Sequence, residues 1–202
     1  MSDADLPFDP AMLDKLAEVA VHVGLGLEPG QNLVLTAPVE ALPLVRRIAA
    51  AAYRAGAANV TPILSDEAVT LARFIHGTDV AFDSAPDWLY RGMAEAFANN
   101  AARLAISADN PMLLKDQDPE RTSRAAKANA AASKPALEKI ANFDINWNIV
   151  SYPGRAWAKQ VFPDLAEAQA VAKLADAIFA ASRVDRDDPV AEWQAHNAKL
   201  RA

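Results

Sequence analysis

Cysteine is absent from all 202 residues, so the chain has no disulfide, no thiol nucleophile and no thiolate metal ligand. Glycine is scarce, with seven residues, and 52% of the residues are hydrophobic, which excludes collagen-like and disordered chains. No window approaches the run of about 18 apolar residues that a membrane-spanning helix requires. The acidic start MSDADLPFDP also lacks the features of a secretory signal. We therefore expect a globular, cytoplasmic protein without a membrane partner.

Positive charge is also in short supply. The 26 acidic residues outnumber the 20 lysines and arginines, and the formal net charge is −6. Binding to the phosphates of a nucleic acid needs a basic stripe, and the sequence contains none. We therefore expect no nucleic-acid partner, and we interpret the net charge as a source of solubility.

Histidine occurs only at positions 22, 76 and 196, and no two of these lie three or four residues apart. That spacing would place two ligands on one helix face, as a zinc site requires. His196 follows Glu192 by four residues, but a helical Glu and His pair is ordinary surface chemistry. The motifs HExxH, GxSxG and the Walker sequence are absent. We expect no metal ligand and no catalytic residue in this chain.

Hydrophobic patterns predict helices and strands in alternation. The expected strands are 32–37, 58–64, 103–107 and 145–151, and the expected helices are 10–23, 39–55, 85–99, 119–141 and 165–181. Pro62 favours an edge position for the second strand. The region 67–76 is weakly patterned. This order predicts an α/β fold, with a parallel sheet of about four or more strands covered by helices on both faces. The alternative is an all-helical, alanine-rich bundle.

Polar residues follow each predicted strand, at the edge where open α/β sheets bind their ligands. They are Thr36 and Glu40 after the first strand, Ser65, Asp66 and Glu67 after the second, Ser107, Asp109 and Asn110 after the third, and Ser151, Tyr152 and Arg155 after the fourth. Some also suit a structural role, since 109–111 is typical of a turn and 66–67 of a helix start. Our candidates for cleft or interdomain contacts are Asp109, Asn110, Ser151, Tyr152 and Arg155.

The stretch WNIVSYPGRAWAKQVFPD, residues 147–164, is the least ordinary segment of the chain. We expect Trp147 and Ile149 to anchor the last strand in the core. Pro153, Gly154 and Pro163 would then direct the chain across the end of the sheet, where Trp157, Val161 and Phe162 would hold it. Arg155 is the one unneutralised polar feature of this segment, so we expect it to meet a substrate carboxylate or an acidic residue of a domain absent from this chain.

A new helix begins close to the end of the sequence. Asp188 is expected to cap it and Pro189 to occupy its first position, with Val190, Trp193 and Leu200 on one apolar face. We expect an N-terminal α/β domain over residues 1–186 and a linker helix over residues 187–202 that leads to a catalytic domain absent from this chain. The alternative is a terminal helix that folds back onto the core.

Five segments carry a family resemblance. They are LDKLAEVAVHVGLGLEPGQNLVL, RAGAANV, RLAISADNPMLL, WNIVSYPGRAWAKQVFPD and DDPVAEWQAHNAKL. Together they resemble the N-terminal half of the thermophilic metalloaminopeptidases, the leucyl aminopeptidase-like group of aminopeptidases T and S. The resemblance implies a longer protein in which two divalent metal ions, zinc, cobalt or similar, are bound by carboxylates, histidines and a tyrosine of the C-terminal half. None of those motifs occurs in this chain.

The resemblance implies the N-terminal domain of a metal-dependent aminopeptidase, which removes N-terminal amino acids from peptides. Its partners would be its own C-terminal catalytic domain and a peptide substrate, and the whole protein would be a homodimer. We expect the 202-residue chain alone to be inactive. One alternative is a self-contained, non-enzymatic α/β module that binds a small ligand at the carboxyl ends of the strands. A pure interaction domain is the other.

Overall fold

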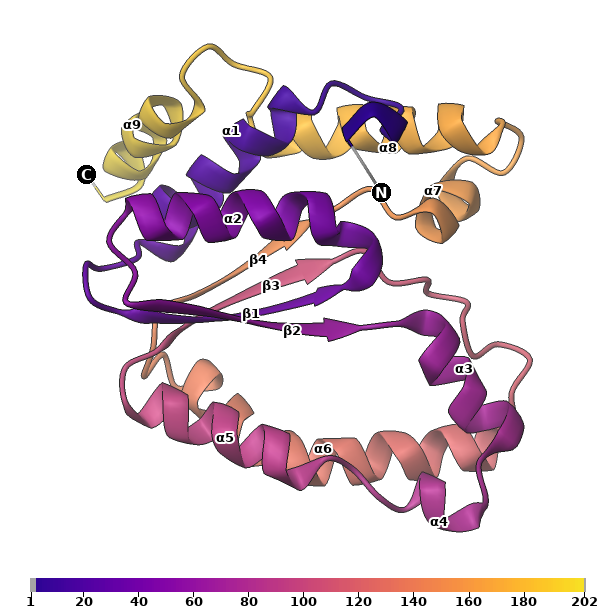
Figure 1. The fold of residues 1–202 in the computed structure, drawn as a ribbon. Helices are drawn as coiled ribbons and strands as arrows, with labels where there is room; N and C mark the ends of the chain where they lie inside the picture. The colour runs from indigo at the N-terminus through magenta and orange to yellow at the C-terminus, as the bar shows by residue number, and fades with distance from the viewer. Residues whose placement is uncertain (1–2, 202) are drawn as a thin grey trace.

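The computed structural model describes residues 3–201, in which four parallel strands form one sheet in the order β2-β1-β3-β4 (Figure 1). The strands are β1 (Asn32–Pro38), β2 (Asn59–Ser65), β3 (Ala102–Ser107) and β4 (Trp147–Ser151). All four arrows point the same way, so their carboxyl ends lie at one edge of the sheet. This arrangement confirms the predicted α/β fold with a parallel sheet.

Helices cover both faces of the sheet. One side, here called the α2 face, carries α1 (Ala11–Val19), α2 (Leu42–Arg54) and α8 (Glu167–Ala181), and the other, the α5 face, carries α5 (Asp87–Ala98) and α6 (Pro119–Ala141) (Figure 1). The remaining elements are η1 (Asp3–Asp5), the π-helix η2 (Ala20–Leu25), η3 (Val39–Ala41), α3 (Glu67–His76), α4 (Asp79–Phe82), α7 (Arg155–Val161) and α9 (Pro189–Arg201). No helix within residues 3–201 is both long and apolar enough to cross a membrane.

β1 explains why these strands are apolar at successive positions. Leu33 and Leu35 are buried in the large core on the α2 face, whereas Val34 between them belongs to a smaller core on the α5 face. A strand alternates its side chains between the two faces, and here both faces are covered. Each large aliphatic side chain that is removed from water in this way stabilises the fold by about 1.5–3 kcal/mol.

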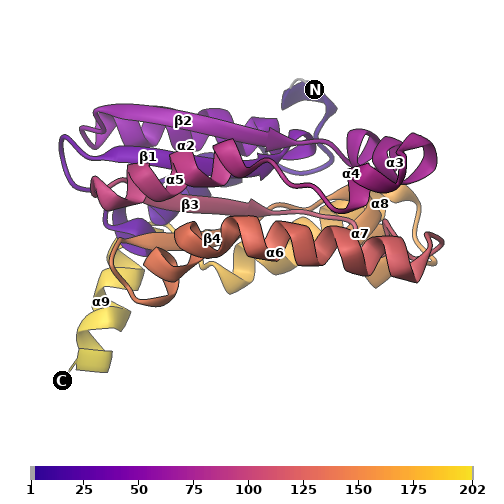
Figure 2. The ribbon, with the colours of Figure 1, turned by 90° about the horizontal axis from the view of Figure 1, so that it is seen from below.

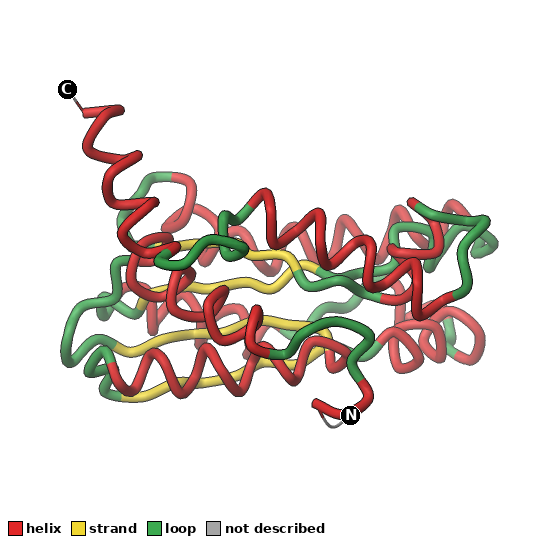
Figure 3. Tube along the Cα trace, turned by 90° about the horizontal axis from the view of Figure 1, so that it is seen from above, coloured by secondary structure: helices red, strands yellow, loops and turns green. Residues whose placement is uncertain are grey.

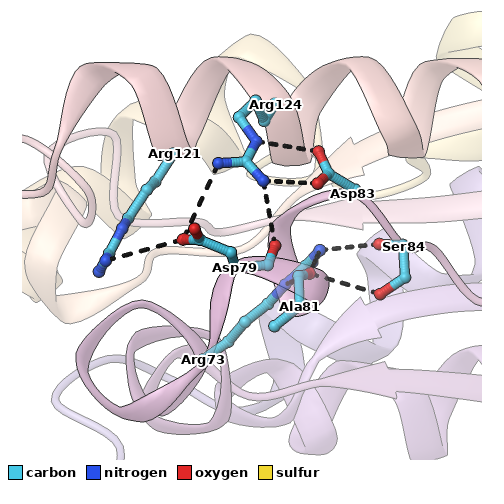
Figure 4. A network of polar contacts seen from close by, with 7 residues as sticks. All are labelled: Arg73, Asp79, Ala81, Asp83, Ser84, Arg121 and Arg124. Atoms are coloured by element: carbon cyan, nitrogen blue, oxygen red, sulfur yellow. Dashed lines mark hydrogen bonds and ion pairs between the residues drawn. The ribbon is translucent and has the colours of Figure 1, made fainter.

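Polar contacts attach α3 and α4 to α6 beneath the α5 face (Figure 4). Arg124 of α6 donates from Nε to Asp83 Oδ1 at 2.9 Å, and its guanidinium also lies 3.9 Å from Asp79. Arg73 of α3 donates to the backbone carbonyl oxygens of Ala81 and Ser84. These charged contacts at the surface add to a small buried apolar cluster in which Phe74 of α3, Phe82 of α4 and Ala125 of α6 pack together.

Three α-helices, α3, α4 and α7, lie where the sequence pattern predicted none. α3 fills the weakly patterned region 67–76, and it begins where Asp66 Oδ1 accepts hydrogen bonds from the backbone N–H groups of Ala68 at 2.7 Å and Val69 at 3.2 Å. This is an ordinary N-cap. α7 interrupts the segment that was expected to cross the end of the sheet.

The expectation for Ile149 is wrong, because 52% of this residue is exposed. β4 is an edge strand, so one of its sides has no neighbouring strand in the described structure. Trp147 is only partly buried, and its ring lies 6.3 Å from that of Phe143. Ile145, just before the strand, is the fully buried anchor instead. Trp157 and Phe162 do pack against the large core, but Val161 is 47% exposed.

α9 leaves the body of the domain at an angle (Figures 2 and 3). Asp188 Oδ1 accepts from the N–H of Ala191 at 2.9 Å, which confirms the predicted cap. Val190 and Trp193 pack against the large core, whereas Leu200 is 73% exposed. The first half of the helix therefore folds back onto the domain, and the second half projects from it.

Candidate functional site

The carboxyl ends of the strands and the loops that follow them, here called the carboxyl edge, contain the switch point of the sheet. From β1 the chain enters α2 on one face, and from β3 it continues to α6 on the opposite face. Because the two connections diverge, the neighbouring strands β1 and β3 leave a crevice, which is where open α/β sheets bind ligands. Several of the polar residues that follow the strands contact one another at this edge.

Glu40 is the central acidic residue of the carboxyl edge. Its Oε1 accepts a hydrogen bond from the backbone N–H of Arg155 at 2.9 Å and lies 3.6 Å from Arg155 Nε. The same Nε lies 3.9 Å from Glu167 Oε1 of α8. The expectation that Arg155 is unneutralised in this chain is therefore wrong, because Glu40 of η3 and Glu167 of α8, distant in sequence, approach it in the fold.

Gly154 makes the contact between Glu40 and Arg155 possible. A Cβ at this position would lie 2.3 Å from the carbonyl oxygen of Ala108 and 3.2 Å from Glu40 Oε2. The first distance is far below van der Waals contact, so only glycine fits between the loops after β3 and β4 without a shift of the backbone. α7 then begins at Arg155, with its first N–H directed at Glu40.

A second carboxylate organises the loop after β3. Glu67 Oε1 accepts from the backbone N–H of Asn110 at 2.8 Å, and Asn110 Oδ1 accepts from the N–H of Met112 at 2.9 Å. Glu40 and Glu67 both line a small hollow of about 190 Å³ at the ends of β1 and β2. Asn110 therefore forms part of a turn that is held by an acid from the neighbouring loop.

Tyr152 is buried, with 2% exposure, on the other side of Glu40. It lines a hollow of about 150 Å³ together with Glu40, Arg155 and Glu167, and its ring lies 6.4 Å from that of Phe8 in an edge-on contact. Burial and the negative charge of Glu40 raise the pKa of the Tyr152 hydroxyl to about 12. Tyr152 is therefore protonated at neutral pH and can act as a hydrogen-bond donor.

Burial also raises the pKa of Glu40, while the hydrogen bond and the positive charge of Arg155 oppose this effect. Glu40 was not among the five selected residues, although the sequence places it directly after β1. Its burial and its pairing with Arg155 depend on the tertiary fold. The geometry offers a buried hydroxyl and two engaged carboxylates, which can contact a polar ligand or another protein surface.

The five selected residues do not form one cluster. Tyr152 and Arg155 share a hollow, and Asn110 lies across Glu40 from them, next to Glu67. Asp109 is exposed, and its side chain forms no hydrogen bond or ion pair within residues 3–201. Ser151 is partly buried opposite Ser107 in the register between β3 and β4. Their roles as cleft or interdomain contacts stay predictions.

A metal centre does not fit the residues that the structure describes. No group of three His, Asp or Glu side chains within residues 3–201 could hold a metal ion. His22 lies 3.0 Å from Glu18 on one helical surface, and His196 lies 3.4 Å from the guanidinium of Arg183. The two histidines therefore lie in separate surface contacts.

Together these features define a doubly wound α/β domain with an ion-paired carboxyl edge and without a metal centre in its described residues. The chain belongs to the thermophilic metalloprotease (M29) family, whose family model matches residues 10–202.

Several relatives support this assignment. The chain is 50% identical over 188 residues to aminopeptidase T of Thermus thermophilus and 45% identical over 195 residues to aminopeptidase 2 of Geobacillus stearothermophilus. Each alignment covers 93% of this chain and 46% of the relative. The solved structure of wild-type AmpT from Thermus thermophilus superposes with a TM-score of 0.87 at 47% identity, over 94% of this chain and 46% of that one. The chain thus spans about half the length of its relatives, roughly their N-terminal part.

Proposed function

We propose that this chain is the N-terminal domain of a metal-dependent aminopeptidase that removes N-terminal amino acids from peptides. The observation that carries the proposal is the match to the thermophilic metalloprotease family over residues 10–202, joined to 50% identity with a protein named aminopeptidase T. A domain that covers 46% of such a relative supplies part of the enzyme. The substrate class and the activity of the whole protein rest on this proposal.

In this proposal the divalent metal ions are bound by the other half of the protein, because the described residues offer no converging ligands. The carboxyl edge would flank that catalytic half and help to shape the access of peptides to it. α9 would act as the linker helix, since its second half projects away from the domain. We further propose that the whole protein is a homodimer in the cytoplasm.

A peptidase assay tests whether the activity requires the half of the protein that lies outside this chain. We expect the purified 202-residue chain to release no p-nitroaniline from leucine p-nitroanilide in the presence of zinc, cobalt or manganese ions. Isothermal titration calorimetry with each ion should likewise show no one-to-one site of micromolar affinity. The control is a longer product that contains both halves, which should be active. Turnover by the 202-residue chain that a chelator abolishes would refute the proposal.

A second candidate function is a self-contained module that binds a small ligand at the carboxyl edge. The observation in its favour is the pair of hollows that meet at Glu40. Mass spectrometry of the natural product separates the two candidates. A mass that corresponds to a longer chain with a second half rich in His and Glu supports the aminopeptidase, whereas a natural stop after Ala202 supports the module.

A further inference from the structure

A hollow on the α5 face is lined by an arginine and, among the described residues, by no Asp or Glu. Arg103 lies on the central strand β3, in register with Val34 of β1 and Trp147 of β4. It is partly buried, and it lines a hollow of about 340 Å³ between the sheet and the helices α5 and α6, here called the Arg103 hollow. Glu40, which lines both carboxyl-edge hollows, does not line the Arg103 hollow, although Ser65 lines both this hollow and the one at the ends of β1 and β2.

The guanidinium of Arg103 makes no side-chain hydrogen bond, ion pair or cation–π contact with any residue in the described range 3–201. Other arginines of the chain have such partners: Arg47 pairs with Asp3 and Asp14, and Arg54 with Glu18. Within residues 3–201, no Asp or Glu lines the Arg103 hollow. Burial alone lowers the pKa of Arg103, and no nearby carboxylate offsets this effect. A partly desolvated cation without a partner is unfavourable, and a bound anion would relieve that cost.

The lining of the hollow determines which anion fits. Most of the lining is apolar and comes from β2, α5 and α6: Ile63, Leu64, Leu89, Met93, Ala136, Leu137 and Ile140. Hydroxyl groups come from four further residues: Thr36, Ser65, Tyr90 and Ser133. One guanidinium balances one negative charge, and its planar geometry suits a carboxylate. The remaining surface suits an apolar group attached to that carboxylate.

An apolar trough adjoins this hollow. It has a volume of about 680 Å³, runs between β2 and α5, and shares Ile63, Leu64, Leu89 and Met93 with the Arg103 hollow. Trp88, which is 72% exposed, also lines the trough. A ligand with its charged end at Arg103 can therefore extend an apolar chain along the trough. An ammonium group beside the carboxylate would find no acidic partner there, which disfavours a free amino acid.

We propose that the Arg103 hollow binds a carboxylate joined to an apolar chain and lacking a neighbouring ammonium group. Two sources share this chemistry: the C-terminus of a short apolar peptide, whose carboxylate is next to an amide, and a fatty carboxylate. The proposal does not depend on where the metal ions of the enzyme are bound, so it can fail while the proposed function stands.

Ligand titration of the 202-residue chain, followed by ¹H–¹⁵N NMR, tests this proposal. We expect saturable shifts with N-acetyl-L-leucine or 4-methylpentanoate, in the amides of β3, α5 and α6. Tighter binding of the first probe indicates a peptide C-terminus, and tighter binding of the second indicates a fatty carboxylate. N-acetyl-L-leucinamide, which has no carboxylate, and free L-leucine should bind at least roughly tenfold more weakly. The proposal would be overturned if neither carboxylate saturated the chain up to about 10 mM. It would also be overturned if N-acetyl-L-leucinamide bound as tightly as the better carboxylate.

The substitution Arg103→Met removes the charge and keeps an apolar chain of similar reach. We expect it to weaken binding of the better carboxylate by roughly tenfold or more without lowering the thermal unfolding midpoint, because an unpaired, partly buried charge is lost. The matched control is Arg46→Met on the exposed surface of α2, which should leave the affinity unchanged. Equal loss of affinity in both variants would show a nonspecific charge effect and refute the site.

Discussion

Gly154 fixes the geometry of the carboxyl edge at the scale of a single residue. A methyl group there would meet the carbonyl oxygen of Ala108, a backbone atom that cannot turn aside as a flexible side chain can. We predict that Gly154→Ala lowers the free energy of unfolding by about 1–3 kcal/mol, the usual cost of inserting atoms into a packed region. Urea unfolding followed by circular dichroism measures this difference.

The matched control for this substitution is Gly92→Ala. Gly92 lies in the middle of α5, and a Cβ there would meet nothing within 4 Å. Alanine in a helix interior is more favourable than glycine by about 0.5–1 kcal/mol, so this variant should be more stable than the wild type. If Gly154→Ala shows the same gain as the control, the close approach to Ala108 does not constrain the site.

Glu40 makes the stability of the domain depend on pH, and the environment of its carboxyl group sets the direction of that dependence. Burial raises its pKa in the folded chain, so its contribution to stability is fully present below pH 4.5 and is lost as the pH rises through the raised pKa. The charged and titratable groups around it are Arg155, Glu67, Glu167 and Tyr152. Glu40→Gln keeps an oxygen that can accept from the N–H of Arg155 and removes the titration.

We predict that Glu40→Gln gains stability relative to the wild type as the pH rises from 4 to 7. The measurement is urea unfolding of both proteins at a series of pH values, with far-ultraviolet circular dichroism as the signal. A difference in unfolding free energy that stays constant across the series, or that moves in favour of the wild type, would contradict the raised pKa of Glu40.

At the scale of the element, the two halves of α9 differ in how they pack. Trp193 packs against the large core, donates from Nε1 to the carbonyl oxygen of Ser182 at 2.8 Å, and lies beneath the guanidinium of Arg183 at 4.7 Å. We predict that Trp193→Ala lowers the unfolding free energy by roughly 2 kcal/mol, less than a fully buried tryptophan would cost. Leu200→Ala, at an exposed position of the same helix, should change it by no more than about 0.5 kcal/mol.

Chemical unfolding measures both α9 variants, and hydrogen exchange gives an independent check. Backbone amides in the first half of α9 should exchange more slowly than those near Leu200, because only the first half is packed on the domain. Uniformly slow exchange along the whole helix in a monomeric sample would show that its second half is also held by this domain.

The elements that sequence patterns predicted well are those with strong periodicity or clear end signals. The helix between Pro119 and Ala141 was predicted with its exact limits, and the strand after Asn32 within one residue. α3 was missed because exposed hydrophobic side chains such as Val69 and Ile75 blur its pattern. Ile149 was predicted to be buried because a short apolar strand has the same sequence pattern at the edge of a sheet as at its centre. Only the order of the strands in the sheet decides whether such a strand lies at the edge or at the centre.

At the scale of the whole molecule, the sequence predicts where the carboxyl edge lies but not which of its residues contact one another. Parallel topology brings the residues after each strand together, so the general location follows from the strand order. The pairing of Arg155 with Glu40 and Glu167 joins three elements far apart in sequence, and no local pattern contains it. The Arg103 hollow was missed for the same reason, since its lining comes from five separate elements.

Pro62 has a consequence for how this domain behaves among other copies of itself. It lies in the middle of β2, an edge strand, and proline is tolerated in such a strand where its nitrogen faces away from the neighbouring strand. The outer side of β2 therefore lacks a donor at its centre and offers a poor template for a strand from another molecule. β4, at the opposite edge, has no proline and exposes Ile149. A strand from another molecule should therefore pair with β4 more readily than with β2, during synthesis or at high concentration. Aggregation would then begin at the β4 edge of the sheet.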